Sequence, residues 1–244
     1  MKRVAIVLFQ LGGPENQAAV EPSLYNLFCD PDIIDFPLAW IARKPLAKLI
    51  STRRSKTVAL HYHEIGGGSP IGRLTEQQGR ALEAALSPHL EAKTFIAMRY
   101  WHPLTSEALA ALAQWPYDEM VLLPLYPHYS YATTRSSLKE WKRQTKSKGG
   151  QKARVIESFY DHPGYIEALR ARIDEKLLKL KDPEKVFLVF SAHGLPMKLI
   201  EKGDPYPVHI DKTMKLVLAR GGWPNQHVLC YQSRVGPQKW LEPS

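Results

Sequence analysis

The sequence has few of the features that mark secreted, disulfide-rich or membrane-spanning proteins. It contains 2 cysteines among 244 residues, Cys29 and Cys230, which are far apart and form no CxxC pair. A disulfide-stabilised miniprotein is therefore excluded, and a reduced, cytosolic compartment is favoured. The longest apolar run, Val4–Phe9, is far shorter than the ~20 residues that a membrane-spanning helix needs. Residues 1–3 lead directly into this run with no small-residue cleavage site after it, so we expect no secretory signal.

Nucleotide-binding motifs are also missing. The first predicted strand ends in Leu11-Gly12-Gly13-Pro14 and not in G-x-G-x-x-G, and the glycines Gly66–Gly68 do not fit G-x-x-x-x-G-K-[ST]. Each glycine segment is compatible either with a tight turn or with a ligand that closely approaches the backbone. His61 and His63 share one face of an extended segment, but no cysteine or carboxylate pair completes a zinc site, which is therefore disfavoured.

Charge and composition are those of a basic globular protein. Apolar residues make up 44% and charged residues 23%, and 33 Lys and Arg against 24 Asp and Glu give a net charge of +9. The basic residues gather within 43–56 and 139–154. Nucleic acid, anionic lipid or an acidic small molecule would each fit such clusters, and for the second cluster a solvated surface is the favoured interpretation.

Strands alternate with amphipathic helices, which predicts a doubly wound α/β architecture with parallel sheets. The helices are predicted at 74–86, 105–115 and 166–180; the last has an apolar stripe of Ile166, Leu169, Ile173, Leu177 and Leu180. Short runs of Val, Ile, Leu and Phe without alternation are typical of strands buried on both faces. They occur at 3–9, 94–98, 120–125, 154–158, 186–191 and 227–232.

The hydrophilic stretch 139–152 is the best candidate for a domain boundary. It predicts an N-terminal lobe over 1–150 and a second lobe over 151–244, with three strands in each. Residues 234–244 look loop-like, so no closing helix follows the last predicted strand. A parallel domain of this size would leave apolar strand faces exposed. We therefore expect the second lobe to be incomplete and the sequence to be shortened at its C-terminal end.

The sharpest candidate for chemistry is His193, in Ser191-Ala192-His193-Gly194-Leu195-Pro196. It follows a predicted strand, and open α/β sheets bind ligands at the carboxyl ends of their strands. Imidazole accepts protons near neutral pH and binds borderline metal ions. The position alone fits a histidine that is merely hydrogen-bonded at a strand end equally well.

Three further segments are candidates for a binding site. Residues 37–54 interleave apolar and basic side chains around Trp40, as in a helix resting on an anionic membrane, in the lip of an apolar pocket, or in an ordinary surface helix. The polar and aromatic segments 98–103 and 124–130 each follow a predicted strand. With His193 they suggest a large crevice lined by aromatic side chains.

Taken in order, these segments resemble the ferrochelatase family along essentially the whole chain. The resemblance also includes Gly203-Asp204-Pro205-Tyr206-Pro207 and Tyr231-Gln232-Ser233-Arg234-Val235-Gly236-Pro237, and it ends at Trp240-Leu241. It implies two chelatase-type lobes with a porphyrin in the cleft between them, and insertion of Fe²⁺ into protoporphyrin IX to form protohaem. It also implies an acidic motif and a final helix, which would lie beyond Ser244.

The resemblance assigns roles to individual residues. His193 is implied as the catalytic, proton-accepting and metal-binding residue, and Pro37–Arg54 as an apolar lip that touches the membrane in some members. The implied substrate-binding residues are Leu11, Arg54, Tyr62, Ser69, Arg99, Tyr100 and Trp240.

The expected partners and alternatives follow from this resemblance. Porphyrin and ferrous iron are expected as substrates, with no further cofactor and no iron–sulfur cluster. The anionic tetrapyrrole fits the charge of +9 without nucleic acid. We expect a cytoplasmic monomer or homodimer that can be peripheral to the inner membrane. The alternatives are a coproporphyrin-specific ferrochelatase, a truncated fragment that binds porphyrin without metallating it, and a phosphate- or nucleotide-binding α/β protein.

Overall fold

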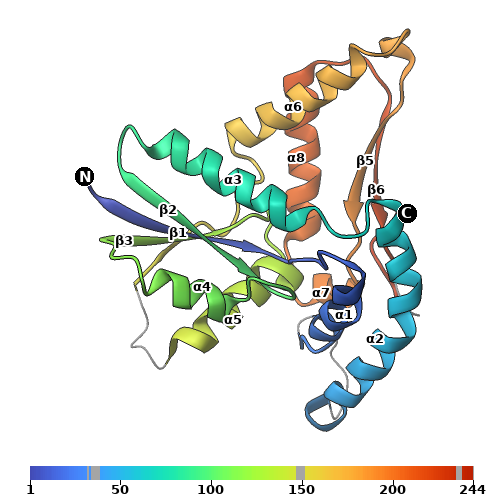
Figure 1. The fold of residues 1–244 in the computed structure, drawn as a ribbon. Coiled ribbons are helices and arrows are strands. Elements are labelled where there is room, and N and C mark those ends of the chain that lie inside the picture. Colours follow the sequence, from blue (N-terminus) through green and yellow to red (C-terminus); the bar gives the residue numbers. More distant parts are fainter. Residues whose placement is uncertain (32, 34–38, 147–151, 235–237, 244) are drawn as a thin grey trace. The chain divides into compact units, whose positions relative to one another are not determined.

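The computed structural model describes residues 1–31, 33, 39–146, 152–234 and 238–243 (Figure 1). The chain forms two compact units. Unit 1 comprises Met1–Tyr126 and Ala132–Glu157, and unit 2 comprises Pro127–Tyr131 and Ser158–Ser244. The division expected between residues 150 and 151 lies outside the described residues and stays a prediction.

Unit 1 is built on a four-stranded parallel sheet in the order β2-β1-β3-β4. The strands are β1 (Arg3–Gln10), β2 (Glu91–Met98), β3 (Glu119–Pro124) and β4 (Arg154–Val155). In β1, Val4–Phe9 are all buried, and Val7 lies opposite both Phe95 and Leu122. The apolar run without alternation therefore forms a strand that is covered on both faces, as the sequence predicts.

Helices cover both faces of this sheet (Figure 1). On one face, Phe9, Phe95 and Leu122 pack with Leu112 and Trp141; on the other, Ile6 and Leu8 pack with Leu82 and Leu86. The sheet is thus doubly wound. The helical elements of unit 1 are η1 (Gln17–Ala19), α1 (Val20–Phe28), α2 (Ala39–Glu64), α3 (Ile71–Leu86), α4 (Thr105–Leu112), the π-helix η2 (Tyr131–Arg135, whose first residue belongs to unit 2) and α5 (Ser136–Thr145).

The sequence interpretation of residues 139–158 is wrong in two respects. Residues 139–145 belong to α5, because Trp141 packs edge-on against Phe9 with ring centroids 5.6 Å apart. The strand predicted at 154–158 has only two residues, and it pairs with β3 of unit 1 instead of joining the second lobe. Four of the ten residues of α5 are charged, so its sequence looks like that of a hydrophilic linker. The strand β4 lies at the edge of the sheet.

Unit 2 contains a two-stranded parallel sheet of β5 (Leu188–His193) and β6 (His227–Gln232), paired from Leu188 with His227 to His193 with Gln232. Among the described residues no third strand joins it. The other elements are α6 (Pro163–Leu177), η4 (Pro183–Lys185), α7 (Met197–Glu201) and α8 (Tyr206–Gly221).

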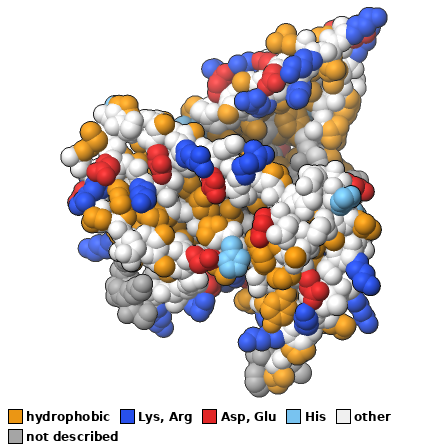
Figure 2. All heavy atoms as spheres, viewed as in Figure 1, with side chains coloured by type: hydrophobic (Ala, Val, Ile, Leu, Met, Phe, Trp, Pro, Cys, Tyr) orange, Lys and Arg blue, Asp and Glu red, His pale blue; other side chains and the backbone are white. Residues whose placement is uncertain are grey.

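The apolar stripe of α6 is only partly buried. Ile166 and Leu177 are buried, but the helix ends at Leu177, and Leu180, which the sequence places on the stripe, is 47% exposed. Between α6, α8 and β5 lies an apolar groove of about 530 Å³, whose lining includes Leu169, Ile173 and Phe190. Hydrophobic side chains are visible among the charged ones over this unit (Figure 2).

Candidate active site

His193 is the last residue of β5, and the chain turns directly after it. The N–H of Gly194 donates to the Gln232 carbonyl at 2.7 Å. A Cβ on Gly194 would lie 2.9 Å from the same oxygen, so a side chain would push the turn away from β6. The glycine after the histidine therefore lets the strand end close to its neighbour, and the His193 side chain is exposed there.

The hydrogen bond of the imidazole defines its tautomer. Nδ1 of His193 lies 2.7 Å from the Gly194 carbonyl oxygen, which can only accept, so Nδ1 carries the hydrogen. In the neutral ring the lone pair then resides on Nε2. This nitrogen of the exposed residue can accept a proton or bind a metal ion. In the described ranges, no group of three or more His, Cys, Asp or Glu side chains is arranged to hold a metal.

Trp240 lies beside the His193 turn. Trp240 forms an antiparallel bridge with Pro196, flanked by hydrogen bonds from Met197 N to Lys239 O (2.9 Å) and from Leu241 N to Leu195 O (3.0 Å). Its indole Cε3 is 3.4 Å from the position of a Cβ on Gly194, and its buried Nε1 has no hydrogen-bond partner. The structure thus brings two of the predicted site residues of unit 2 together.

In unit 1, Leu11, Arg99 and Tyr100 lie together where β1 and β2 end. The ladder continues past both strands: Arg99 N donates to Gln10 O, and Tyr100 N donates to Leu11 O, each at 2.9 Å. These three predicted residues are therefore neighbours on the carboxyl edge of the sheet, where an open α/β sheet binds its ligand.

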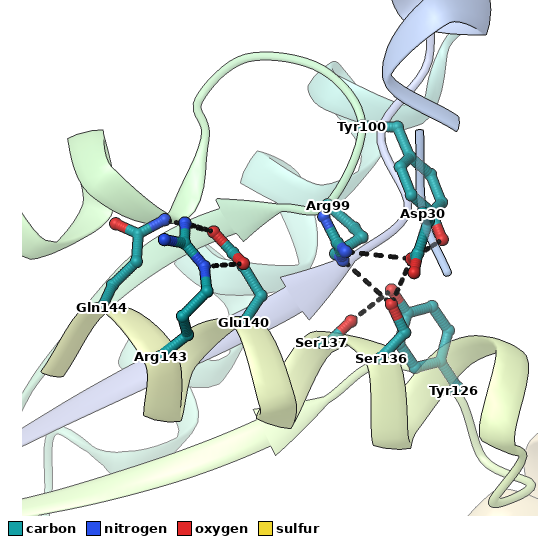
Figure 3. Close-up of polar contacts among 9 residues, drawn as sticks. All are labelled: Asp30, Arg99, Tyr100, Tyr126, Ser136, Ser137, Glu140, Arg143 and Gln144. Atoms are coloured by element: carbon teal, nitrogen blue, oxygen red, sulfur yellow. Dashed lines mark hydrogen bonds and ion pairs between the residues drawn. The ribbon is translucent and has the colours of Figure 1, made fainter. Parts of the chain in front are cut away.

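The side chains of Arg99 and Tyr100 converge on Asp30, a residue that the sequence interpretation missed (Figure 3). Asp30 Oδ2 lies 3.0 Å from a guanidinium nitrogen of Arg99, and it accepts hydrogen bonds from the hydroxyls of Tyr100 (2.7 Å) and Ser136 (2.5 Å). Burial first, and then the Asp30 charge, raise the pKa of Tyr100 far above its usual value. The phenol therefore stays a hydrogen-bond donor.

A polar cavity of about 350 Å³ opens beside this network. Its wall on α5 includes Glu140, whose pKa is lowered chiefly by hydrogen bonds from Arg143 at 2.7 and 2.8 Å. The two charged side chains that α5 contributes to the wall, Glu140 and Arg143, therefore form an ion pair with each other. The remaining wall is formed by Asn26, Cys29, Asp30, Met98, Arg99, Leu104, Thr105, Ser106 and Gln144.

The two glycine segments of the sequence pack against each other. Ser69 N donates to the Pro14 carbonyl at 2.7 Å, and a Cβ on Gly13 would lie 2.7 Å from Ser69 Oγ. The close approach that the glycines allow is thus between two backbone segments of unit 1. Ser69 therefore lies next to the Leu11–Pro14 turn, and Ser69 and Leu11 are both predicted substrate-binding residues.

Arg54 and Tyr62 lie on α2, eight residues apart, which is roughly 12 Å along a helix axis. Arg54 is exposed, with its guanidinium carbon 5.8 Å from the centre of the Phe28 ring. Tyr62 is half-buried, and burial raises the pKa of its phenol. The roles of these residues, of His193 and of the other predicted site residues remain predictions.

The expected aromatic crevice also remains a prediction. Of its two segments, 98–103 lies in unit 1, and 124–130 divides between the units after Tyr126. Tyr126 is buried, and burial raises its pKa well above the usual value. His128 lies among tyrosines of unit 2, with ring centroids 6.4 Å from Tyr160 and 6.0 Å from Tyr206.

Comparison with known proteins confirms the family. The family model described as Ferrochelatase matches residues 3–244. The chain is 49% identical over 246 residues to a ferrochelatase of Caulobacter vibrioides, covering all of this chain and 70% of that protein. It is 48% identical over 252 residues to one of Parasynechococcus marenigrum, covering 64% of that protein. The chain therefore spans about two thirds of the length of these relatives, and it belongs to the ferrochelatase family.

Proposed function

We propose that this chain functions as a ferrochelatase, a lyase of haem biosynthesis that inserts Fe²⁺ into protoporphyrin IX. The reaction forms protohaem and releases the two pyrrole protons, so the charges and protons balance. The observation that supports this proposal most strongly is the family match over residues 3–244. The exposed His193 imidazole at the carboxyl end of β5 gives the match a chemical basis.

His193 serves as the proton acceptor. Its Nε2 lone pair takes a pyrrole proton, while Nδ1 donates to the Gly194 carbonyl and holds the ring in one tautomer. Because the side chain is exposed, the imidazolium returns the proton to water and is ready for the second proton. The same lone pair can bind the incoming ferrous ion only while Nε2 carries no proton, so the ion must pass to the porphyrin before Nε2 accepts a pyrrole proton.

The predicted residues of unit 1 hold the porphyrin. Arg54 pairs with a propionate, for which a guanidinium is well suited. Leu11, Tyr62, Ser69, Arg99 and Tyr100 are the other proposed porphyrin-binding residues of unit 1, and Trp240 is the proposed one of unit 2. Aromatic and apolar side chains can hold the macrocycle bent at a cost of ~1–5 kcal/mol, which exposes the pyrrole lone pairs to the metal. Iron and porphyrin are both substrates, and the proposed reaction requires no iron–sulfur cluster or other cofactor.

A metal-insertion assay tests the proposal. The 244-residue chain is mixed with protoporphyrin and Fe(II), or Zn(II) as a second metal, and the metalloporphyrin is followed by absorbance. Metallated product is expected, and failure to bind any tetrapyrrole would contradict the proposal. A parallel reaction with coproporphyrin identifies the preferred acceptor.

A second candidate is a protein that binds porphyrin without metallating it. It is favoured by one observation, namely that the chain spans 64% of the length of its relative from Parasynechococcus marenigrum. Porphyrin binding without product would support this candidate. Turnover by a chain extended to the length of the relatives would then show that the added residues are needed for metal insertion.

We further propose that α2 makes the peripheral membrane contact expected of residues 37–54, of which 37 and 38 lie outside the described residues. Ile41 is 59% and Leu49 is 47% exposed, and Lys44 and Arg53 are exposed on the same helix. No described helix is both long and apolar enough to cross a bilayer. Sedimentation with anionic vesicles, but not with neutral ones, would support a cytoplasmic protein that binds membranes peripherally.

A further inference from the structure

We propose that Asp30 is a positioning residue of the porphyrin site and that it acts through Arg99 and Tyr100. This inference rests on the proposed function, in which those two residues contact the porphyrin. Asp30 itself follows α1, and its side chain is completely buried, with 0% exposure. It is therefore placed to orient other groups and not to contact solvent.

A buried carboxylate must be compensated by hydrogen bonds and opposite charge, and Asp30 obtains both from the candidate site. Three donors meet its Oδ2: the guanidinium of Arg99 at 3.0 Å and the hydroxyls of Tyr100 and Ser136 at 2.7 and 2.5 Å. Bonds to an ionised acceptor are stronger than neutral ones. The carboxylate thus fixes the positions of three side chains at once (Figure 3).

The guanidinium of Arg99 is held along two directions. Nε donates to Ser136 Oγ at 2.9 Å, and a terminal nitrogen pairs with Asp30, so the plane of the group is defined. The Arg99 side chain is 18% exposed and lines the 350 Å³ polar cavity. A flexible arginine is thereby converted into an oriented donor at the edge of the site.

Tyr100 is fixed at both ends. Its hydroxyl donates to Asp30, its N–H donates to Leu11 O at 2.9 Å, and its carbonyl accepts from Asn26 Nδ2 at 3.0 Å. Asn26 lies in α1 and Asp30 follows that helix, whereas Tyr100 follows β2. The carboxylate therefore joins the segment before α2 to the edge of the sheet that holds Leu11.

The test uses Asp30→Asn, which preserves shape but places an NH₂ group and a neutral oxygen among three donors. Porphyrin affinity is measured by fluorescence or absorbance titration, at a temperature where melting curves show the variant to be folded. We expect the Kd for protoporphyrin to rise between about 10-fold and 100-fold, as expected when a binding group is misplaced. Ser136→Ala, which removes one of the three donors, should raise Kd less.

Glu140→Gln is the matched control. Glu140 lines the same cavity and is a partly buried carboxylate, but it accepts its hydrogen bonds from Arg143 and Gln144. Its Kd should match that of the wild type. A double variant separates positioning from stability: if Asp30 acts through Arg99, adding Asp30→Asn to Arg99→Met should weaken porphyrin binding little further.

The outcomes distinguish this inference from the proposed function. A wild-type chain that binds no porphyrin would overturn both. Normal wild-type binding together with an unchanged Kd in folded Asp30→Asn would overturn the role of Asp30 alone. An equal loss of affinity in Glu140→Gln would also overturn it, because the general charge of the cavity would then determine binding. If Asp30→Asn does not fold, an unchanged Kd in Ser136→Ala decides against the proposal.

Discussion

At the scale of single residues, His193 is the group on which the proposed chemistry depends. We expect His193→Ala to lower kcat for metal insertion by about 10²- to 10⁴-fold, the usual contribution of a positioned proton acceptor. Porphyrin affinity should change little, because the proposed porphyrin contacts lie on other residues. Stopped-flow absorbance gives kcat, and a separate equilibrium titration without metal gives the affinity.

His227 provides the matched control for this variant. It lies at the other end of the same sheet, at the start of β6, and it is also exposed. His227→Ala should therefore leave insertion unchanged. Undiminished turnover in His193→Ala, in a preparation whose wild type is active, would remove the histidine from the mechanism.

We expect the partly buried His128 to make the stability of unit 2 depend on pH. Burial, and secondarily the neighbouring His209, lower its pKa to about 4, against ~6.5 in an unfolded chain. Because the unfolded state binds the proton first, stability is complete above about pH 6.5 and falls as pH decreases towards 4, by at most about 3 kcal/mol. Thermal melts between pH 7 and 4 measure this slope.

The substitution His128→Gln should flatten that slope, because it removes the titrating group but keeps a side chain able to bond to Thr213, which lies 2.9 Å from His128 Nε2. His89→Gln, at an exposed histidine of unit 1, should leave the slope as it is. If His128→Gln and the wild type lose stability in parallel, another group causes the acid sensitivity.

The sequence could identify His193 but not Asp30, for a physical reason. A histidine followed by glycine at a strand end is visible locally, since the strand pattern and the turn residue lie side by side in the chain. The partners of Asp30 are Arg99, Tyr100 and Ser136, 69 to 106 positions away. Only folding brings them together, and Asp30 stands in no distinctive local pattern.

At the scale of elements, the turn between α2 and α3 depends on a close backbone approach. A Cβ on Gly68 would lie 2.2 Å from the Glu15 carbonyl oxygen, so either segment must move. We expect Gly68→Ala to reduce the free energy of unfolding by about 1–3 kcal/mol, the usual cost of overpacking, and to displace Ser69. Urea denaturation gives the free energy, and porphyrin titration reports on Ser69.

Gly72→Ala tests the same chemical change four residues later. A Cβ on Gly72, in the first turn of α3, would meet nothing within 4 Å. Alanine there should be neutral or stabilise the protein by up to about 1 kcal/mol, since it restricts the unfolded chain. Equal stabilities of the two variants would contradict the close approach at Gly68.

Long apolar strands were easier to predict than short or amphipathic elements. The predicted strand 227–232 coincides with β6, and β1 extends one residue beyond its predicted end. By contrast, the buried residues of α5 are Ser136, Ser137, Trp141 and Thr145, of which only Trp141 is hydrophobic, so its sequence shows no apolar stripe. The short helix α7 has no buried residue, and its sequence shows no apolar period.

At the scale of the whole molecule, the sequence predicts the α/β class and two units but not which strands join which sheet. Chain order placed the segment near residue 154 with the second half, whereas hydrogen bonding places β4 beside β3. Likewise, residues 127–131 belong to unit 2 although unit 1 residues lie on both sides of them in the chain. Such assignments depend on long-range pairing, which a single sequence does not encode locally.

The two sheets should differ in local stability. β1 is bonded on both sides, to β2 and β3, and every residue from Val4 to Phe9 is buried. In the described part of unit 2, β5 is bonded to β6 alone, and Val189 in its middle is 58% exposed. The free energy of the local opening that exposes a backbone amide to exchange depends on the packing around it. A two-stranded sheet with an exposed apolar side should therefore open more readily than a sheet that is covered on both faces.

Hydrogen exchange followed by mass spectrometry should therefore find β1 the slowest-exchanging strand, and peptides covering β5 and β6 should exchange markedly faster. Because the His193 turn follows β5, porphyrin or metal binding there should slow the exchange of β5 more than that of β1. Unit 2 would then gain order from its ligand, whereas the sheet of unit 1 is rigid without it. Exchange of β5 as slow as that of β1 in the free chain would contradict this, and would mean that the exposed side of the β5–β6 sheet is covered in solution.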